Sequence, residues 1–549
     1  MVSKIKRGRF LILFLLITGV ALVLYAGDIY SEISQAMRLY DKAYRQLVVN
    51  YLDPIHAEKL TEVTIRKMLE ELDPYTVFLT DDENEPIRTM ARGNYGGVGL
   101  QISKRSDTLT VISPIDMGPA KRAGIFANDK IVKVDSISTI GLSLDSCAKL
   151  IRGKVGTKVD LTVIRFGVSG ESVYELKREK IQVKDVSYAG FLKEGVGYIK
   201  LTGFSRGASS EIRQSLNTFT KEGDLSALIL DLRGNSGGLL AEALAVSELF
   251  TQPGDTLLLT RGKTEASNKV FTSKISPAIP SEVKLAVLVD RGSASASEIV
   301  AGVVQDLDRG VVLGYPSFGK GLVQTVYRLD KEHSVKITTA KYYIPSGRLI
   351  QKPEFIRNLD LVDESAPTDT VFYSRNGRKL AGGGGIKPDF EVESQRLPKY
   401  VRELWRQNMF YQYAQQYRKE KGEDGLAQLN QSELLEDFRD FLARNDFEYQ
   451  TDEEEELRAW EKKIRKDKDI EPIEGGLDSY YRLFTDIKAK EYDKHPDLIL
   501  QAILGEIGTI YDGPAGRVLA TYQHDKVIMK AFQVLRSETD YTVTLGYAD

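Results

Sequence analysis

The sequence predicts an α/β multidomain protein, with a mixed α/β core between an N-terminal helical segment and a C-terminal helical extension. A chain of 549 residues is too long for one compact hydrophobic core. Its central part alternates short apolar, β-rich runs with helical stretches, a pattern typical of strands buried in a sheet. Beyond about residue 393 the chain becomes highly charged and helical in pattern, and its acidic run Asp452–Glu456 is interpreted as a solvated helix face.

The first residues indicate export. Four basic residues (Lys4, Lys6, Arg7 and Arg9) precede an apolar run from Phe10 to Tyr25. A spanning helix needs roughly 20 apolar residues and a signal-peptide core about 7 to 15, so this run lies between the two lengths. We interpret residues 1–27 as an uncleaved membrane anchor, because no clean small-x-small cleavage site follows. A cleaved signal peptide and a buried core helix are the alternatives.

The basic cluster predicts which side of the membrane the chain occupies. Positive charges stay on the cytoplasmic side, so everything after Asp28 is expected outside. The expected location is therefore the cell envelope, with the bulk of the chain on the outer (periplasmic or extracytoplasmic) side.

Charge and rare residue types exclude several functions. The net charge is −3, without the basic excess of a nucleic-acid binder. The single cysteine, Cys147, cannot form an internal disulfide, and its apolar surroundings favour a buried hydrophobe over a catalytic thiol. The four histidines (His56, His333, His495 and His524) lack metal-ligand spacing. We therefore predict neither a metal site nor a cofactor.

Changes of pattern divide the chain into segments. After the anchor, apolar residues such as Met37, Tyr40 and Tyr44 recur at helical spacing, which indicates a helical cap or dimerisation element and leaves homo-oligomerisation open. A small module of short β-type runs with helical stretches near Gly118–Ala123 and Ser143–Ile151 follows, and then the mixed α/β core. The predicted segments are residues 1–27, 28–92, 93–178, 179–395 and 396–549.

A serine-rich turn in the core is the first candidate for chemistry. The apolar run Leu285–Asp290 is followed by Arg291-Gly-Ser-Ala-Ser-Ala-Ser-Glu298 and then by an apolar helix. A serine on a strand-to-helix turn lies at the helix N-terminus, where free backbone N–H groups favour a developing oxyanion. A plain turn of small residues is the alternative, so a nucleophile is predicted only if a base accompanies it.

The candidate base is Lys320, in Phe318-Gly-Lys-Gly-Leu-Val-Gln324. Lysine can deprotonate a serine hydroxyl if burial lowers its pKa from about 10.4 toward neutrality. Gln324 falls on the same face of a helix or a strand as Lys320, and its amide could hold the amine without a negative charge that would raise the pKa. His333 lies in a polar turn, where we expect it at the surface.

A glycine-rich turn supplies candidate oxyanion donors. The apolar run from Leu228 ends in Asp231-Leu-Arg-Gly-Asn-Ser-Gly-Gly238, before an expected helix Leu239–Phe250. Such a turn could present backbone N–H groups beside the nucleophile. The alternative is an ordinary helix N-terminal turn.

Together, three motifs resemble those of the C-terminal processing (tail-specific) serine peptidases, in the family's order and at similar spacing. The motifs are Asp231-Leu-Arg-Gly-Asn-Ser-Gly-Gly238, Gly292-Ser-Ala-Ser-Ala-Ser-Glu-Ile299 and Ser317-Phe-Gly-Lys-Gly-Leu-Val-Gln324. The segments Thr339–Arg348 and Gly385–Phe390 also match the family's closing strands, with an insertion between them. The resemblance covers about Arg38 to Val392 and fades in the C-terminal segment.

This resemblance implies roles for individual residues. Ser295, rather than Ser293 or Ser297, corresponds to the nucleophile, Lys320 to its general base and Gln324 to the glutamine that accompanies the base. The family's oxyanion hole corresponds to the backbone N–H of Ala296 with that of Gly237 or Gly238, and the sequence does not decide between the two glycines.

The module at residues 93–178 then resembles a PDZ domain. Tyr95-Gly-Gly-Val-Gly-Leu100 is similar to a carboxylate-binding loop, and Gly118–Ile125 and Asp129–Asp135 support the likeness. Consecutive N–H groups of Val98, Gly99 and Leu100 can hold a terminal carboxylate while a peptide adds to the sheet edge. The expected activity is a serine endopeptidase that captures the C-terminal region of exported proteins and cleaves them through an acyl-enzyme.

Two rival interpretations use the same residues. Gly314-Tyr-Pro-Ser-Phe-Gly-Lys320 fits the spacing of a phosphate-binding loop, but Gly321 stands where Ser or Thr would bind Mg²⁺, and a β-rich run follows. A catalytically inactive PDZ scaffold of the cell envelope is the second rival. The intact set of Ser295, Lys320 and Gln324 argues against it.

Overall fold

A computed structural model describes residues 30–547 apart from residues 106, 116, 194, 353–370, 393–396, 424 and 465–473. The predicted anchor, residues 1–27, lies outside the described residues. The described chain forms two units: a smaller one with the residues up to Leu79 and Tyr327–Lys336, and a larger one with the rest. Among the helices so described, none is both long and apolar enough to span a membrane.

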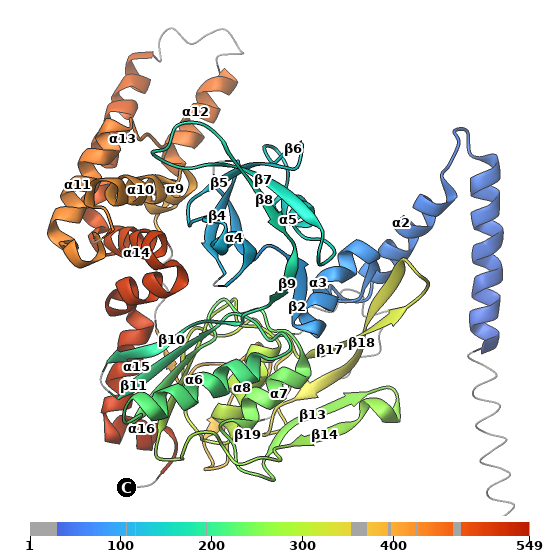
Figure 1. The fold of residues 1–549 in the computed structure, drawn as a ribbon. Coiled ribbons are helices and arrows are strands. Elements are labelled where there is room, and N and C mark those ends of the chain that lie inside the picture. Colours follow the sequence, from blue (N-terminus) through green and yellow to red (C-terminus); the bar gives the residue numbers. More distant parts are fainter. Residues whose placement is uncertain are drawn as a thin grey trace, which may run out of the picture. The chain divides into compact units, whose positions relative to one another are not determined.

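The centre of the larger unit is a six-stranded sheet in the order β10-β11-β12-β15-β16-β21. Figure 1 labels its strands β10 and β11. β10 runs antiparallel to β11, and the other neighbours are parallel, as expected for near-continuously apolar strands. The strands are β10 Val186–Lys193, β11 Val196–Leu201, β12 Ala227–Asp231, β15 Lys284–Val289, β16 Val311–Gly314 and β21 Phe390–Glu391.

Helices cover both faces of this sheet. One face packs against α6 Ala208–Glu222, α7 Leu240–Glu248 and α8 Ala296–Asp306 in a continuous core. The opposite face packs against α15 Lys526–Arg536 and α16 Glu538–Thr544 at the C-terminus. The Tyr541 hydroxyl accepts the N–H of Leu285 at 2.8 Å, so the end of the chain is part of the core layer.

A second, antiparallel sheet lies beside the core. Its strands in the larger unit are β13 Thr256–Gly262, β14 Lys269–Thr272, β17 Leu322–Arg328 and most of β18 His333–Tyr343. Tyr342 of β18 and Leu258 of β13 are buried in the same core as α8. This sheet contains β17, which follows Lys320 in the chain, and it packs against α8, which follows Ser295.

Residues Leu100–Lys177 form a separate small sheet in the order β3-β4-β5-β7-β8, with β6 on β5. Its own core contains Val98, Cys147 and Leu161. The pair β2–β9 precedes and follows it in the chain. The elements are β2 Asn94–Gly97, β3 Leu100–Arg105, β4 Thr108–Pro114, α4 Pro119–Arg122, β5 Lys130–Val134, β6 Ile137–Ser138, α5 Leu144–Ile151, β7 Lys158–Ile164, β8 Ser172–Lys177 and β9 Glu179–Gln182.

Six helices after the core sheet form a helical domain with a core of its own, rich in tyrosine and phenylalanine. They are α9 Lys399–Arg406, α10 Met409–Lys421, α11 Gln431–Arg444, α12 Asp452–Ile464, α13 Glu474–Lys494 and α14 Pro496–Thr521. α14 is kinked, because Gly513 has φ 53° and ψ −140° and Pro514 follows it. Pro514 cannot donate the helical hydrogen bond, so the chain bends there.

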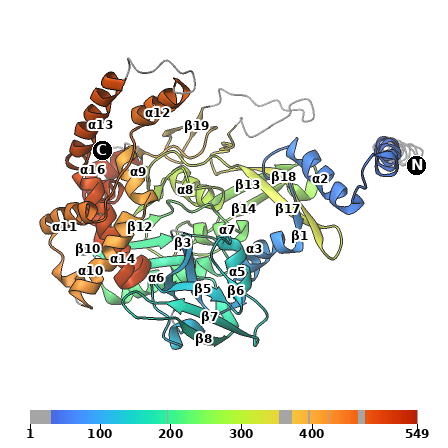
Figure 2. The ribbon, with the colours of Figure 1, turned by 90° about the horizontal axis from the view of Figure 1, so that it is seen from above.

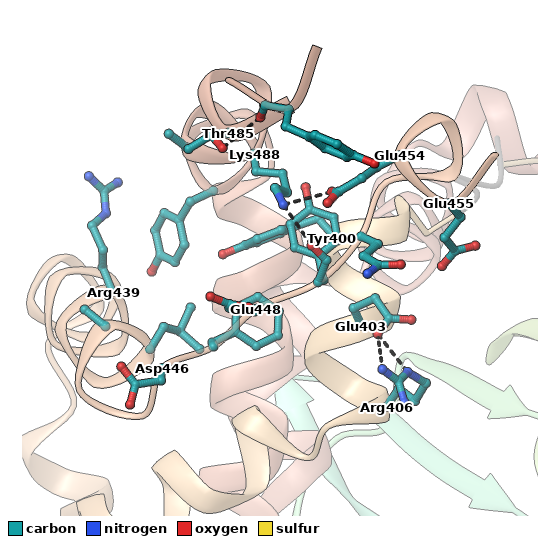
Figure 3. A pocket seen from close by; sticks show the side chains of 18 of the residues that line it. Tyr400, Glu403, Arg406, Arg439, Asp446, Glu448, Glu454, Glu455, Thr485 and Lys488 are labelled. Atoms are coloured by element: carbon teal, nitrogen blue, oxygen red, sulfur yellow. Dashed lines mark hydrogen bonds and ion pairs between the residues drawn. The ribbon is translucent and has the colours of Figure 1, made fainter. Parts of the chain in front are cut away.

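This helical domain contains a cavity of about 990 Å³, which Figure 3 shows from close by. Lys488 donates to Glu454 at 2.9 Å and to the carbonyl of Tyr449 at 3.2 Å. Glu454 is 2% exposed, so the expectation of a fully solvated acidic run is wrong at this position. Glu454 is buried because Lys488 and Arg458 neutralise it.

The smaller unit contains a helix over residues 30–50, α2 Ala57–Glu70 and the start of β1 Val77–Thr80. Tyr44 donates from its hydroxyl to the carbonyl of Ala57 at 2.5 Å and thereby joins the two helices. Phe78 stacks on His333 at a ring distance of 5.2 Å. The predicted mixed α/β core with helical segments before and after it is confirmed.

Two short elements complete the larger unit. α3 Asp81–Arg92 begins with a capping box, in which Thr80 and Glu83 exchange hydrogen bonds. A two-stranded ribbon of β19 Phe372–Tyr373 and β20 Lys379–Leu380 follows the gap in the described chain. In Figure 2, β3 of the small sheet lies between α14 on one side and α5 on the other.

Candidate active site

Ser295 stands on the turn between β15 and α8. Its backbone has φ 55° and ψ −110°, a conformation that costs a non-glycine residue about 1–3 kcal/mol and is found where function requires it. Its side chain is half-buried, and every residue of α8 is buried. The turn therefore displays Ser295 at the N-terminus of a fully enclosed helix, as the sequence indicates.

Lys320 lies in the short loop between β16 and β17, and Gly321 separates it from β17. The loop is held by the buried carboxylate of Glu298. Its Oε1 accepts the N–H of Gly319 at 2.6 Å and the hydroxyl of Ser317 at 2.5 Å. Its Oε2 accepts the N–H of Lys320 at 2.9 Å and also the N–H of Ser295 at 2.8 Å. One side chain thus ties the segments of the candidate base and the candidate nucleophile together.

Tyr342 makes a second connection between the same two segments. Its hydroxyl lies 3.2 Å from the carbonyl oxygen of Ser295 and also contacts the carbonyl oxygen of Lys320. Tyr342 is 1% exposed, so solvent does not compete for these contacts. Both the N–H and the C=O of the two candidate residues are therefore fixed by shared partners.

The glycine-rich turn lies directly against the serine turn. A Cβ at Gly237 would be 2.7 Å from the carbonyl oxygen of Ala294 and 3.0 Å from the nitrogen of Ala296. No side chain fits there, and Gly237 also has φ 99°. Asn235 fixes the contact, because its carbonyl accepts the N–H of Ala294 at 3.0 Å and the hydroxyl of Ser297 at 2.8 Å.

The two glycines differ in what their N–H groups do. Gly237 donates to the side-chain oxygen of Asn235 at 2.9 Å, so its N–H is already used. Within the described residues, the N–H groups of Gly238 and Ala296 have no acceptor in the protein. Of the alternatives left open by the sequence, this geometry favours Gly238 as the partner of Ala296.

The turn itself is anchored by a buried charge cluster. Asp231 is fully buried and accepts hydrogen bonds from Arg233, Lys200 and the hydroxyl of Tyr198. Burial by itself would raise the pKa of Asp231, but the positive charges of Arg233 and Lys200 outweigh it and hold that pKa well below its usual range. Arg233 also pairs with Asp525 at 2.8 Å, which connects the turn to the start of α15.

Gln324 lies in β17 and donates from its side-chain nitrogen to the hydroxyl oxygen of Thr338 on β18 at 3.3 Å. This contact orients the amide and leaves its oxygen as an acceptor. His333, the weaker candidate base, instead pairs with Asp330 at 2.9 Å in the turn between β17 and β18. Hydrogen bonding to Asp330 raises the pKa of His333.

The single cysteine lies in a hydrophobic core. Cys147 is 1% exposed in the core of the small sheet, where burial raises the pKa of its thiol. It is a buried hydrophobe, as predicted. Over the described parts of the chain, no group of three or more His, Cys, Asp or Glu side chains is arranged to hold a metal ion.

The predicted carboxylate-binding loop lies between β2 and β3. The carbonyls of Val98 and Gly99 accept the N–H groups of Ala120 and Ile115, at 3.0 and 2.9 Å, which fixes the loop against the start of α4. The N–H groups of Val98 and Gly99 have no protein acceptor in the described chain. Leu100 begins β3, which is an edge strand of its sheet. The loop and the edge therefore offer the N–H groups and the free strand that a peptide C-terminus needs.

Sequence reasoning missed Glu298 and Tyr342. A signal for Glu298 was present, because Ser295-x-x-Glu298 has the spacing of a helix capping box, in which the glutamate returns to the N–H of the first residue. Nothing in the sequence pairs Tyr342 with residues 295 and 320. Its place depends on how β18 packs against α8.

Comparison with known proteins shows which families the chain resembles. Residues 195–361 match "Peptidase family S41", residues 110–165 match "PDZ domain" and residues 400–535 match "Probable PDZ-protease, C-terminal helical domain". The chain is 34% identical over 325 residues to a carboxy-terminal-processing protease of Bartonella bacilliformis, covering 59% of this chain and 73% of the relative.

Among solved structures, two matches are to proteases of this kind or to a part of one. The photosystem II D1 C-terminal processing protease is 27% identical, with a TM-score of 0.35, covering 65% of this chain and 87% of that one. The PDZ domain of the Vibrio cholerae carboxy-terminal protease, solved in complex with a peptide, is 28% identical, with a TM-score of 0.16. The match to it covers 16% of this chain and 99% of that one.

The fold, the site and these matches together define a serine peptidase that carries a PDZ domain and a C-terminal helical domain. More particularly, the chain belongs to the C-terminal processing peptidases of family S41. The resemblance deduced from the three motifs is therefore confirmed at the level of the family.

Proposed function

We propose that this chain is an exported, membrane-tethered endopeptidase that captures proteins by their C-terminal region and cleaves them with Ser295 and Lys320. The observation that carries this proposal is the shared anchoring of the two segments, since Glu298 binds the N–H of both residues and Tyr342 contacts the C=O of both. A base can activate a nucleophile only if the two are held in a suitable relative position, and these contacts connect the backbones of the two residues.

The proposed reaction proceeds through an acyl-enzyme. The neutral amine of Lys320 takes the hydroxyl proton of Ser295 while Oγ attacks the peptide carbonyl carbon. The N–H groups of Ala296 and Gly238 stabilise the oxyanion, the ammonium of Lys320 protonates the leaving nitrogen, and the C–N bond breaks. Water then attacks the ester, giving one proton to Lys320, which returns it to Ser295 Oγ as the acid leaves.

Gln324 positions the amine in this scheme. Its side-chain nitrogen is used by Thr338, so its oxygen can accept a hydrogen bond from Lys320 without adding a charge. An uncharged neighbour matters, because a carboxylate there would raise the pKa of the lysine and reduce the fraction of free amine.

The PDZ loop is proposed to receive the terminal carboxylate. The N–H groups of Val98, Gly99 and Leu100 would surround it, while the tail pairs with the free edge of β3. Residues 1–27 are proposed to anchor the chain, with the peptidase on the outer side of the membrane. Recovery of the full chain in the membrane fraction, with its peptidase part degraded by protease added outside, is the expected result.

The activity is tested with the chain from about Asp28 onward and an unfolded protein that ends in apolar residues. We expect cleavage by the wild type, none by Ser295→Ala or Lys320→Ala, and weaker cleavage when the substrate C-terminus is amidated. All variants should show the same thermal unfolding as the wild type. Cleavage that survives Ser295→Ala contradicts the assigned nucleophile, and binding without any cleavage by the wild type supports the inactive scaffold.

A further inference from the structure

The helical domain packs on the PDZ domain through one face of α14. The carboxylate of Glu506 on α14 forms an ion pair with the guanidinium of Arg105 on β3, at 2.6 Å. The same guanidinium lies 4.0 Å from the ring centre of Tyr411 on α10. Seven residues further along α14, Gly513 lies against Ser113 of β4, because a Cβ there would be 3.4 Å from the Ser113 side chain. α14 therefore follows the β3–β4 ribbon from its far end toward the carboxylate-binding loop, and Figure 2 shows it beside β3.

This contact is fixed by a buried charge. Glu506 is 2% exposed and is paired with Arg105 and, at 3.2 Å, with Arg517. Separating the domains would remove Arg105 from Glu506 and leave Arg517 of the same helix as its remaining charged partner, which is costly for a carboxylate this buried. The helical domain is therefore held beside the edge strand that a peptide would join.

Between these elements lies a crevice of about 1060 Å³. One part of its lining is the expected peptide groove, with Leu100–Ile102 of β3 and Leu144 and Ala148 of α5. Another part is the kink of α14, residues 510–515. Tyr511, Pro514 and Ala515 at the kink line the crevice, as do the apolar PDZ residues Pro114 and Ile115. The groove of the PDZ domain is thus continuous with a surface of the helical domain.

The register of β3 shows which peptide side chain would reach this surface. A tail that adds to β3 alternates its side chains between the two faces of the sheet. Those on the face of Leu100 and Ile102 point toward the PDZ core, where these two residues pack. Those on the face of Gln101 point the other way. Gln101 pairs with Ser113, and Ser113 is the residue that the kink covers. With the terminal residue beside Leu100, the penultimate side chain is on the same face, and the exposed Gln101 lies between it and Ser113.

We infer that the kink of α14 is a specificity wall that contacts the penultimate side chain of a bound tail and favours a large apolar one. The inference rests on the proposed capture of C-termini by the PDZ domain. A PDZ domain alone would leave this side chain in solvent. Here Tyr511, Pro514 and Ala515 line the crevice and would remove an apolar side chain from water, whereas an acidic one would lose its hydration there.

Binding of labelled tail peptides to the Ser295→Ala chain from about Asp28 onward tests this without interference from cleavage. The peptides differ only in the penultimate residue, which is leucine or glutamate. We expect leucine to bind about tenfold more tightly, the effect of burying roughly half of its side chain. Adding Ala515→Glu should weaken the leucine peptide about tenfold and abolish the preference, since it places a charge in the apolar wall.

Two controls separate the possible failures. Leu519→Glu alters an exposed position of α14 outside the crevice and should leave the preference intact. Peptides that differ at the antepenultimate residue, which faces the PDZ core, should respond equally in both backgrounds. If tails bind in a carboxylate-dependent way but Ala515→Glu leaves the penultimate preference unchanged, the specificity wall is refuted while the capture mechanism stands. If no tail binds in a carboxylate-dependent way, the proposed capture itself is refuted.

Discussion

The backbone N–H groups of Ser295 and Lys320 donate to one carboxylate oxygen, Oε2 of Glu298, at 2.8 and 2.9 Å. Residues 25 positions apart in the chain are thereby held at a fixed relative position by a side chain that is not itself a candidate for chemistry. Burial raises the pKa of Glu298, whereas the hydrogen bonds it accepts favour its charged form. Four donors converge on it: the N–H groups of Ser295, Gly319 and Lys320 and the hydroxyl of Ser317.

Glu298→Gln is expected to lower kcat about 10- to 100-fold with little change in KM, the effect of losing one hydrogen bond to a charged group. The amide nitrogen of glutamine would face N–H donors where the carboxylate oxygen accepted them, so the two candidate residues would shift. Steady-state kinetics on a tail-bearing substrate measures this. Glu454→Gln is the matched control, because it changes a buried, hydrogen-bonded glutamate of the helical domain. Equal loss of kcat in both variants would contradict a positioning role for Glu298.

Gly237→Ala should abolish measurable cleavage, since its Cβ would collide with the carbonyl of Ala294 and crowd the N–H of Ala296. Gly234 in the same turn provides the comparison. It also has a positive φ, of 69°, but no atom lies within 4 Å of the position of an added Cβ. Gly234→Ala should therefore cost about 1 kcal/mol of stability through backbone strain and retain activity. Cleavage assays and denaturant unfolding on both variants decide the matter, and an active Gly237→Ala would remove the glycine turn from the proposed site.

Asp231→Asn is expected to destabilise the protein by about 3–5 kcal/mol at neutral pH, because Arg233 and Lys200 would lose their buried counter-charge. The same pairing predicts a pH dependence. The folded-state pKa of Asp231 is lowered, so its contribution is present above the pKa of an unfolded aspartate, about 3.9, and is lost as the pH falls below it. Urea unfolding between pH 3 and 7 should show stability falling toward acid in the wild type.

In the Asp231→Asn variant this part of the pH dependence should be absent, because no carboxylate remains to be protonated at that position. Other acidic residues still titrate, so the difference between the two proteins is the quantity to compare. A constant difference across the whole range would mean that folding does not shift the pKa of Asp231.

Glu506→Gln should loosen the packing of the helical domain on the PDZ domain and cost about 2–3 kcal/mol, since both Arg105 and Arg517 lose a charged partner. We expect faster amide hydrogen exchange in β3, β4 and the kink of α14. Glu179→Gln removes the exposed ion pair with Arg122 and should change neither stability nor exchange measurably. Unaltered exchange at β3 in Glu506→Gln would show that other contacts hold the two domains together.

Much of the candidate site could be predicted from the sequence alone, because each part of it is a short continuous segment of the chain. Ser295 lies on a turn of small residues between a strand and an apolar helix, and these three elements are consecutive in the chain. The glycines on both sides of Lys320 indicate that other groups can come close to its backbone. The three motifs were specific enough to indicate the family, and the PDZ domain followed from its loop and its spacing. Cys147 and the separate helical segments also follow from local apolar periodicity.

The local sequence pattern does not decide whether Gly237 or Gly238 supplies the second candidate oxyanion donor. Both are glycines of the same turn, and only the hydrogen bond from Gly237 to Asn235 distinguishes them. Tyr342 likewise reaches Ser295 and Lys320 from a different strand, because two sheets pack on α8. The acidic run of α12 was predicted to be solvated, yet Glu454 is buried, since Lys488 of another helix neutralises it.

The sequence by itself determined the chemistry-bearing residue types, their order, the family and the division into a PDZ module, a mixed α/β core and helical segments. These depend on short-range periodicity, turn residues and motif spacing. Tertiary structure alone decided that Glu298 and Tyr342 join the two candidate residues, that α15 and α16 cover the core sheet and that α14 follows the β3–β4 ribbon. Those contacts join residues as many as 401 positions apart. A local sequence pattern does not specify which distant residue will pair with a given buried charge.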